Sequence, residues 1–306
     1  MNSVSVDRLI KKYKHVAALN DISFTVDKGE IFGLIGPDGA GKTSLFRILS
    51  SLLLQDNGTA TVMGFDVVQD YKTIRKITGY MPGRFALYQD LSVEENINFF
   101  ASIFGVKLQD NYDIIKDIYS QIEPFKKRRA GKLSGGMKQK LALSCALIHK
   151  PEILILDEPT TGVDAVSRKE FWDILKNLQK LGITILVSTP YMDEAELCDR
   201  IALIQSGNIL DINSPGNIKH KFYKKLFSIS SSERHLLNKA INQYPFAHSA
   251  YSFGDSVHYI DNRQEFDPVD IMEYLRLKGI ADTEINEIEP TIEDTFIFLM
   301  EQKNGG

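Results

Sequence analysis

The feature that most constrains this chain is a glycine-rich loop that lies between an apolar run and a helical pattern. Residues 31–35 are typical of a buried strand, and residues 44–51 have the spacing of a helix. The loop between them fits the pattern G-x-x-x-x-G-K-[ST], which requires this order of strand, loop and helix. Its members are Gly36, Pro37, Asp38, Gly39, Ala40, Gly41, Lys42 and Thr43.

The residue types in this loop suit a bound triphosphate. Glycines let successive backbone N–H groups turn toward an anion, and the following helix presents its unpaired N–H groups to the same place. Lys42 would contact the β- and γ-phosphates, and the hydroxyl of Thr43 would ligate Mg²⁺. The alternative is a chance glycine turn before a core helix, and the strand-to-helix context argues against it.

Length and charge limit the remaining possibilities. A chain of 306 residues suits one large α/β domain and a smaller one, and a net charge of −4 provides no basic field for nucleic acid. The basic cluster at residues 126–129 is explained by a solvated helix end or loop. Cys145 and Cys198 are too few and too scattered for a disulfide framework or a metal site. With no signal-peptide pattern and no long apolar run, we expect a soluble, cytoplasmic protein.

Two further regions surround the loop. Residues 2–7, 22–26 and 59–63 alternate apolar and polar side chains, which predicts short strands of an antiparallel sheet. Tyr13 lies between the first two and could stack on a purine base, or could be an ordinary strand-edge tyrosine. Residues 84–148 have mostly helical patterns, which predicts a helical subdomain.

Two later segments carry further candidate chemistry. Ser134, Gly135 and Gly136 open a helix, which is compatible with a second anion site or with a plain helix cap. The apolar run 153–156 ends in Asp157 and Glu158, where α/β sheets place their ligands. Asp157 would hold Mg²⁺ through water, and Glu158 would polarise the water that attacks the γ-phosphate.

Taken together and in this order, these segments resemble an ATP-binding cassette, the motor subunit of ABC transporters. The resemblance covers residues 1 to about 214, and residues 36–39 and 137–140 are similar to the branch of bacterial drug and small-molecule exporters. It implies a P-loop NTPase cassette with a RecA-like core, an antiparallel β subdomain and a helical subdomain. It rests on Tyr13, the loop 36–43, the signature segment 133–137, the strand ending in Asp157 and Glu158, and the segment 161–164.

The family pattern also assigns roles to the matching residues. Tyr13 would stack on adenine, and the signature Ser134–Gly135–Gly136 would clasp the γ-phosphate of ATP held by a second cassette. Asp164 would lie across the dimer seam. Two such cassettes hold two ATP molecules head to tail and act on a multi-spanning permease. The resemblance therefore implies ATP and Mg²⁺ as cofactors, a peripheral location at the inner face of the cell membrane, and no nucleic-acid partner.

Two positions depart from the family pattern. Gly83 follows residues 79–82 where the family has a Gln that contacts Mg²⁺ and the attacking water, and Gln89 is a possible substitute. Pro190 follows the strand 183–188 where the family has a His that hydrogen-bonds the γ-phosphate. Proline has neither a side-chain donor nor a backbone N–H.

These departures predict a site that binds ATP but hydrolyses it poorly, in a heterodimer whose other site is competent. The alternative is a homodimer that tolerates both substitutions. For the protein as a whole we expect an export ATPase subunit; a non-transport cassette protein or a regulatory nucleotide-binding module are the alternatives.

The rest of the chain, residues 215–306, predicts a small α+β domain. Strands at 226–230, 247–253, 257–261 and 282–288 and helices at 233–243 and 268–278 follow the order of ferredoxin-like modules. A last helix after Pro290 has an apolar face, and its ending resembles those of the same exporter branch. We expect this domain to be structural, dimerising or regulatory.

Overall fold

The computed structural model describes residues 2–263 and 265–304. The chain forms two compact units, Met1–Ile218 and Lys219–Gly306. A short helix, α7 (Pro215–Lys219), spans the boundary, so the division lies slightly beyond the position 214/215 taken from the sequence.

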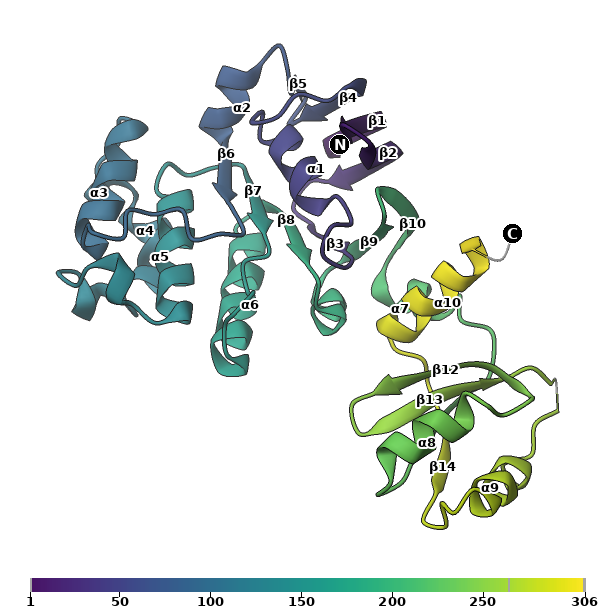
Figure 1. Cartoon of the computed structure of the whole chain (residues 1–306). Helices are drawn as coiled ribbons and strands as arrows, with labels where there is room; N and C mark the ends of the chain where they lie inside the picture. The colour runs from purple at the N-terminus through teal and green to yellow at the C-terminus, as the bar shows by residue number, and fades with distance from the viewer. Residues whose placement is uncertain (1, 264, 305–306) are drawn as a thin grey trace. The chain divides into compact units, whose positions relative to one another are not determined.

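A mostly parallel sheet forms the centre of the first unit (Figure 1). Its strand order is β10-β9-β3-β8-β7-β6, and only β10 runs antiparallel to its neighbour. Every residue of β3, β7 and β8 is buried, as expected for strands covered on both faces. The strands are β3 (Ile31–Ile35), β6 (Thr78–Met81), β7 (Ile153–Asp157), β8 (Thr184–Thr189), β9 (Arg200–Gln205) and β10 (Asn208–Asn213).

Helix α1 (Lys42–Leu49) lies between this sheet and a second, antiparallel sheet (Figure 1). The order of the second sheet is β2-β1-β4-β5, with β1 (Asn2–Tyr13), β2 (Val16–Asp27), β4 (Asn57–Val62) and β5 (Phe65–Asp66). The expectation of short strands at 2–7 and 22–26 was wrong in extent. Bulges between Val6 and Leu9 and between Leu9 and Lys11 break the alternation that the sequence pattern relies on.

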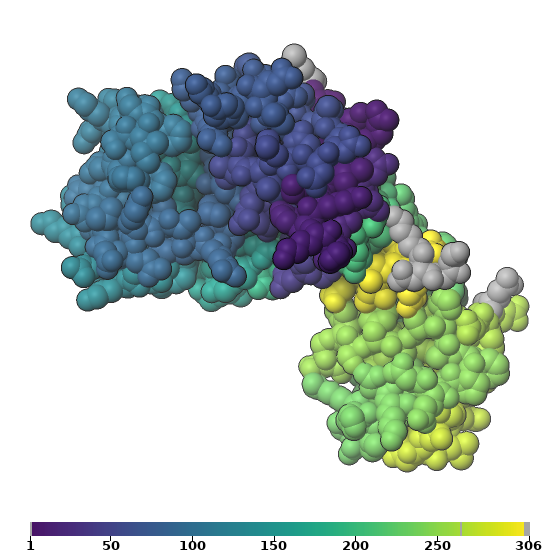
Figure 2. Space-filling model, turned by 45° about the horizontal axis from the view of Figure 1, so that its top comes forward, coloured from purple at the N-terminus to yellow at the C-terminus, as the bar shows by residue number. Residues whose placement is uncertain are grey.

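The helical part of this unit contains α3 (Val93–Ile103), α4 (Tyr112–Tyr119) and α5 (Gly135–Leu147), with short 3₁₀ turns between them, whereas α2 (Tyr71–Ile77) lies beside β5 and β6. Figure 2 shows this part, in blue and teal, at one end of the unit and the N-terminal strands, in purple, at the other. Helix α6 (Ala165–Lys180) packs on the central sheet through Phe171, Trp172 and Leu175. The acidic segment Met192–Leu197 is a 3₁₀ helix rather than an α-helix.

The second unit is a four-stranded antiparallel sheet in the order β12-β13-β11-β14. If the four strands are numbered 1 to 4 along the chain, their order in the sheet is 4-1-3-2 from β14 to β12. A helix follows the first and the third strand, so this unit has a ferredoxin-like fold. The elements are β11 (Leu226–Ser230), α8 (Arg234–Ile241), β12 (Ala247–Phe253), β13 (Ser256–Asp261), α9 (Pro268–Leu277) and β14 (Glu284–Ile288). Helices α8 and α9 cover one face of this sheet.

The last helix, α10 (Ile292–Asn304), packs on the other face, where Phe298 contacts Leu226 and Ile260. The fully buried Asp294 stabilises the first turn of α10. One carboxylate oxygen accepts from Tyr251 Oη and lies 2.6 Å from His258 Nδ1, and the other accepts from Thr291 N at 2.7 Å. The side-chain bonds outweigh burial and lower the pKa of Asp294. In the described residues no helix has both the length and the apolar character needed to cross a membrane.

Candidate nucleotide site

Strand β3 delivers the chain into the glycine loop, and two of the glycines are required by close approach. A methyl group on Gly36 would lie 2.1 Å from the carbonyl oxygen of Ile204 in β9. Gly41 has φ 109°, and a methyl group there would lie 2.1 Å from the carbonyl oxygen of Ala18. Larger residues at either position would collide with main chain that cannot rotate away.

The loop ends at the N-terminus of α1. The first bond of this helix runs from Leu45 N to Gly41 O at 3.1 Å, so the amides of Lys42, Thr43 and Ser44 precede any intrahelical partner. Ala40 N donates to Pro37 O at 3.2 Å, which leaves Asp38 and Gly39 exposed at the tip of the loop. This arrangement presents unpaired N–H groups and the positive end of the helix to one small volume.

Lys42 lies inside the loop and is only 3% exposed. Its ammonium group donates to Gly36 O at 2.7 Å and to Pro37 O at 3.0 Å, and lies 3.1 Å from a carboxylate oxygen of Glu158. The charge is thus held by the loop and by the acid at the end of β7.

Ser188 at the end of β8 organises the two acids. It stands beside Asp157 in the parallel register, and its hydroxyl donates to Asp157 Oδ1 at 2.7 Å. Glu158 N donates to the carbonyl and hydroxyl oxygens of Ser188 at 3.1 and 3.0 Å. These bonds hold Glu158 in a left-handed conformation, φ 50°, which a non-glycine residue rarely adopts and which accompanies its contact with Lys42.

The negative charge of Asp157 affects the pKa of Tyr80 in β6. Burial and, second, the negative charge of Asp157 raise the pKa of the Tyr80 phenol. The Asp157 carboxyl is buried and has one oxygen free of hydrogen bonds from the described residues.

The residues present fit MgATP. The free amides of α1 and the ammonium of Lys42 suit the phosphates, and the hydroxyl of Thr43 and the free oxygen of Asp157 are the hard oxygen ligands that Mg²⁺ prefers. Among residues 2–263 and 265–304 no cluster of three His, Cys, Asp or Glu side chains could hold a metal by itself. Magnesium bound here would depend on phosphate and water ligands, as is usual for nucleotide enzymes.

Tyr13 lies beside the start of α1, next to the glycine loop. Its hydroxyl lies 3.3 Å from Ser44 Oγ, one residue after the glycine loop, and its ring is 44% exposed. Lys11 lies over the ring at 5.6 Å from its centre. An accessible aromatic face beside the loop is compatible with stacking on a base.

The signature segment contacts a different part of the unit. Ser134 caps α5 by accepting from Met137 N at 3.4 Å. A methyl group on Gly136 would lie 2.7 Å from Ser167 Oγ in α6, and one on Gly135 would lie 3.2 Å from Gly162 O. These glycines therefore have a packing role as well as any role toward ATP.

Asp164 caps α6, where it accepts from Ser167 N at 3.0 Å. This bond from the Ser167 backbone lowers the pKa of the Asp164 carboxyl, which is solvent-exposed. Ser134 and Asp164 each begin a helix next to the Gly136–Ser167 contact, so the signature and the segment 161–164 form one surface.

Both departing positions face the nucleotide site. A methyl group on Gly83 would lie 3.0 Å from Asp157 O and 3.8 Å from its carboxyl carbon, so a side chain here would begin beside the magnesium ligand. Pro190 follows Thr189, whose carbonyl accepts from Gly36 N at 3.4 Å. Gln89 instead lies beside Gly131, whose N–H donates to its carbonyl at 2.9 Å.

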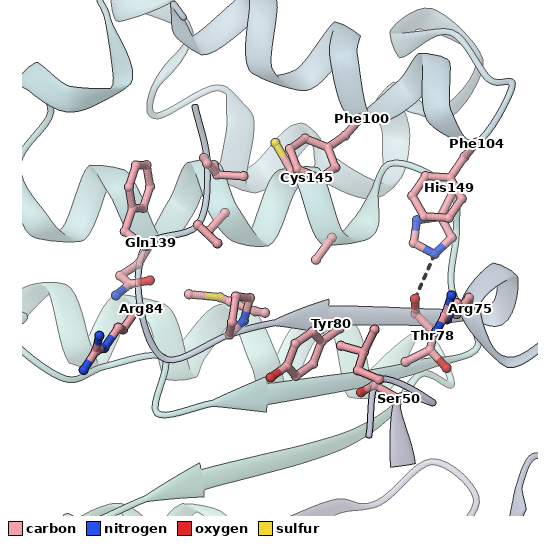
Figure 3. Close-up of a pocket in the computed structure, with 18 residues that line it drawn as sticks. Ser50, Arg75, Thr78, Tyr80, Arg84, Phe100, Phe104, Gln139, Cys145 and His149 are labelled. Atoms are coloured by element: carbon pink, nitrogen blue, oxygen red, sulfur yellow. Dashed lines mark hydrogen bonds between the residues drawn. The ribbon is translucent and has the colours of Figure 1, made fainter. Parts of the chain in front are cut away.

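A groove of about 370 Å³ opens between β6 and the helical subdomain (Figure 3). Phe100 and Phe104 lie on its helical side and Tyr80 on its strand side. Val93, Ile97, Phe100 and Phe104 have the spacing of one helix face. Val93 and Ile97 are buried in the core, whereas the two phenylalanines are half-buried in this groove.

His149 forms one end of the groove. Phe104 stacks on its ring at 3.8 Å, and His149 Nε2 lies 3.2 Å from Thr78 O, the bond drawn in Figure 3. Burial lowers the pKa of His149 to about 4, against the smaller opposing effect of the Thr78 bond. The ring is therefore neutral at pH 7, and the groove is predominantly apolar.

Three residues that shape the site were not predicted from the sequence, because each contacts residues that are distant along the chain. Ser188 orders both acids, Ser167 contacts Gly136, and buried Glu194 accepts from Thr160 at 3.0 Å, which ties the segment after Pro190 to the segment before Asp164. Of the three, only Ser188 could be singled out from the sequence, because it lies at the end of an apolar run, two residues before Pro190.

Comparisons with known proteins agree with this geometry. The ABC transporter family profile matches residues 19–161. The probable multidrug ABC transporter ATP-binding protein YbhF of Escherichia coli (strain K12) is 39% identical over 289 residues, 92% of this chain and 49% of that protein. The chain thus spans about half the length of that relative.

The Nod factor export ATP-binding protein I of Rhizobium sp. (strain N33) is 33% identical over 305 residues, 98% of each chain. A solved structure of an ATP-binding subunit of an ABC transporter superposes with a TM-score of 0.65 at 26% identity, over 72% of this chain and 92% of that chain. The chain belongs to the ABC transporter family and has the fold of its ATP-binding cassettes.

Proposed function

We propose that this chain is the ATP-binding subunit of an export transporter, and that it binds MgATP firmly but hydrolyses it slowly at its own site. One observation carries the second half of the proposal. Gly83 and Pro190 both adjoin the site, while Lys42, Asp157 and Glu158 are in place around the loop.

Binding and turnover depend on different groups. The loop amides and Lys42 would hold the phosphates in the ground state, so their presence supports tight binding. Hydrolysis also needs donors directed at the charge that develops in the transition state, and loss of one such donor typically lowers the rate by about 10²–10³. Gly83 offers no side chain, and Pro190 offers neither a side-chain donor nor an N–H.

The exposed start of the signature, Ser134 and Gly135, supports a second cassette as partner. Within the chain Gly135 and Gly136 pack against residues 162–167 and Ser134 caps α5, and in a head-to-tail dimer the three residues would reach the γ-phosphate bound by the partner. Asp164 lies beside them. We infer that this chain completes a competent site on a different cassette.

The partner proposal is tested with purified proteins. ATP hydrolysis is measured for the chain alone and for its mixtures with cassette proteins from neighbouring genes. We expect a large gain in one mixture and loss of that gain when Ser134→Arg is introduced into this chain. Equal activity of the chain alone and in every mixture would favour the homodimer instead.

The apolar groove supports a membrane permease as the other partner. Phe100 and Phe104 expose aromatic surface beside β6, which leads directly to Gly83 at the nucleotide site. A permease segment in the groove would place this chain at the inner face of the cell membrane. We propose no nucleic-acid partner, because the net charge is −4.

Co-isolation from membranes tests this second partner. The wild-type chain should carry a multi-spanning membrane protein with it, and Phe100→Ser should lose that protein while still binding MgATP. The exposed Phe99→Ser is the matched control, since Phe99 does not line the groove. Retention of the membrane protein by the Phe100 variant would contradict the proposed docking site.

A further inference from the structure

A second cavity lies entirely within the ferredoxin-like unit and has no part in the proposed ATPase. Its volume is about 420 Å³, within the range of small-molecule sites. The segment 223–225 before β11, the end of β13 and the start of the connection to α9 form its walls.

Three aromatic residues, Tyr223, Phe227 and Phe266, line the cavity. Phe227 and Phe266 contact each other edge to face at 4.6 Å between ring centres. Tyr223 is 74% exposed, although it rests on Phe298 and its hydroxyl accepts from Gln302 at 3.4 Å. An exposed ring and a packed pair of rings that line the same cavity would suit a flat, apolar body.

The acidic group of the cavity is already satisfied. Asp261 accepts from Tyr259 Oη at 2.6 Å, from Arg263 N at 2.8 Å, and from Arg263 Nε and Nη2 at 3.0 and 3.1 Å. Both of its oxygens are already engaged, chiefly by Arg263, so it offers little to a cationic ligand.

The basic residues that line the cavity differ in whether they form ion pairs. Arg263 is bound to Asp261 and, through Nη1, to Asp270 at 2.8 Å, and it stacks over Phe246 at 4.3 Å. Lys225 pairs with Glu287 at 3.6 Å. Lys224 is half-buried in the wall, and across the described part of the chain no carboxylate lies within ion-pair distance of it.

We propose that this cavity binds a small, flat monoanion, with its apolar body against Tyr223 and Phe266 and its negative charge on Lys224. One ammonium group without an ion-pair partner beside aromatic side chains favours an aromatic or similarly flat carboxylate or sulfonate over a cation or a polyanion. This inference is independent of the nucleotide site and stands or falls separately from the proposed ATPase.

A matched pair of fluorescent probes tests it on the full chain in saturating MgATP. The anion is 8-anilinonaphthalene-1-sulfonate, and the neutral probe is N-phenyl-1-naphthylamine, which has the same rings without the sulfonate. We expect Lys224→Glu to weaken the affinity for the anion about tenfold or more, since a charged hydrogen bond is replaced by repulsion, and to leave the affinity for the neutral probe unchanged.

Two further variants complete the experiment. Lys239→Glu makes the same charge change on the exposed face of α8, outside the cavity, and should leave the affinities for both probes unchanged. Tyr223→Ala should weaken both probes. The proposal is overturned if Lys224→Glu binds the anion as wild type does, if Lys239→Glu weakens it as strongly, or if Lys224→Glu weakens both probes equally.

Discussion

Replacing Gly136 with alanine should separate the packing role of the signature from any role toward ATP. A methyl group at this position would lie 2.7 Å from Ser167 Oγ and 2.8 Å from Ser167 Cβ. Ordinary contacts of a Cβ atom begin near 3.4 Å, so the two approaches are short by 0.7 and 0.6 Å. The hydroxyl can rotate away, but Ser167 Cβ moves only if α5 and α6 separate.

The cost follows from that separation. Overpacking in a core typically costs about 1–3 kcal/mol, and the higher helix propensity of alanine returns up to about 1 kcal/mol. We therefore expect a net loss of about 1 kcal/mol, which corresponds to a midpoint about 2–4 °C lower for a unit of this size.

Thermal unfolding without nucleotide or partner measures this loss, because no ATP contact exists under those conditions. Ser167→Gly removes both clashing atoms, so the double variant G136A/S167G should be more stable than the sum of the two single effects predicts. Wild-type stability for G136A, or strict additivity in the double variant, would refute the packing account.

Three other changes follow from the structure. Gly36→Ala would place a methyl group 2.1 Å from Ile204 O, so we expect loss of about 3 kcal/mol or more and little folded protein; a folded, soluble variant would contradict the close approach. Asp294→Asn removes the buried carboxylate that accepts from Tyr251 and Thr291 and should lower the stability of the second unit by about 1–3 kcal/mol in urea, and an unchanged midpoint would argue against the anchor at α10. Burial lowers the pKa of His149 in the folded chain to about 4, below the ordinary 6.5 of the unfolded chain. As the pH falls, the unfolded chain therefore binds a proton at His149 before the folded chain does. The free energy of unfolding that is present above pH 6.5 is lost as the pH falls toward 4. We expect His149 to contribute a loss of about 2 kcal/mol in the free energy of unfolding between pH 7 and pH 4.5, measured by urea unfolding. This contribution should be absent in His149→Phe.

The sequence predicted the parts of this molecule that depend on local patterns. The segment from Gly36 to Thr43 follows β3 and runs into the first turn of α1, in the expected order of strand, loop and helix, because glycine geometry and apolar periodicity depend on adjacent residues. In the second unit the expected strands at 226–230 and 247–253 match β11 and β12. The order of elements was enough to predict a ferredoxin-like sheet.

What the sequence could not predict depends on contacts between distant segments. Ser188 acts on Asp157 and Glu158 only because β7 and β8 are neighbours in register. The bulges of β1 displace its alternation, so its full length was hidden. The close approach of Gly136 to Ser167 and the cavity around Lys224 likewise appear only after the helices and strands are packed.

Restoring the two departing residues tests the central proposal most directly. ATP hydrolysis is measured for the purified wild-type chain and for G83Q/P190H, with G83A/P190A as the control that changes the same positions without supplying either functional group. Binding of MgATP is measured in parallel, so that a change in turnover is not confused with a change in affinity.

We predict similar ATP affinity for all three proteins, slow turnover for the wild type and the control, and a rate at least about tenfold higher for the restored variant. Position 83 admits a side chain with a shift of a few tenths of an ångström, because its Cβ would lie 3.0 Å from Asp157 O. Rapid hydrolysis by the wild-type chain alone, unchanged in the restored variant, would contradict the account of a site that holds ATP without efficient turnover.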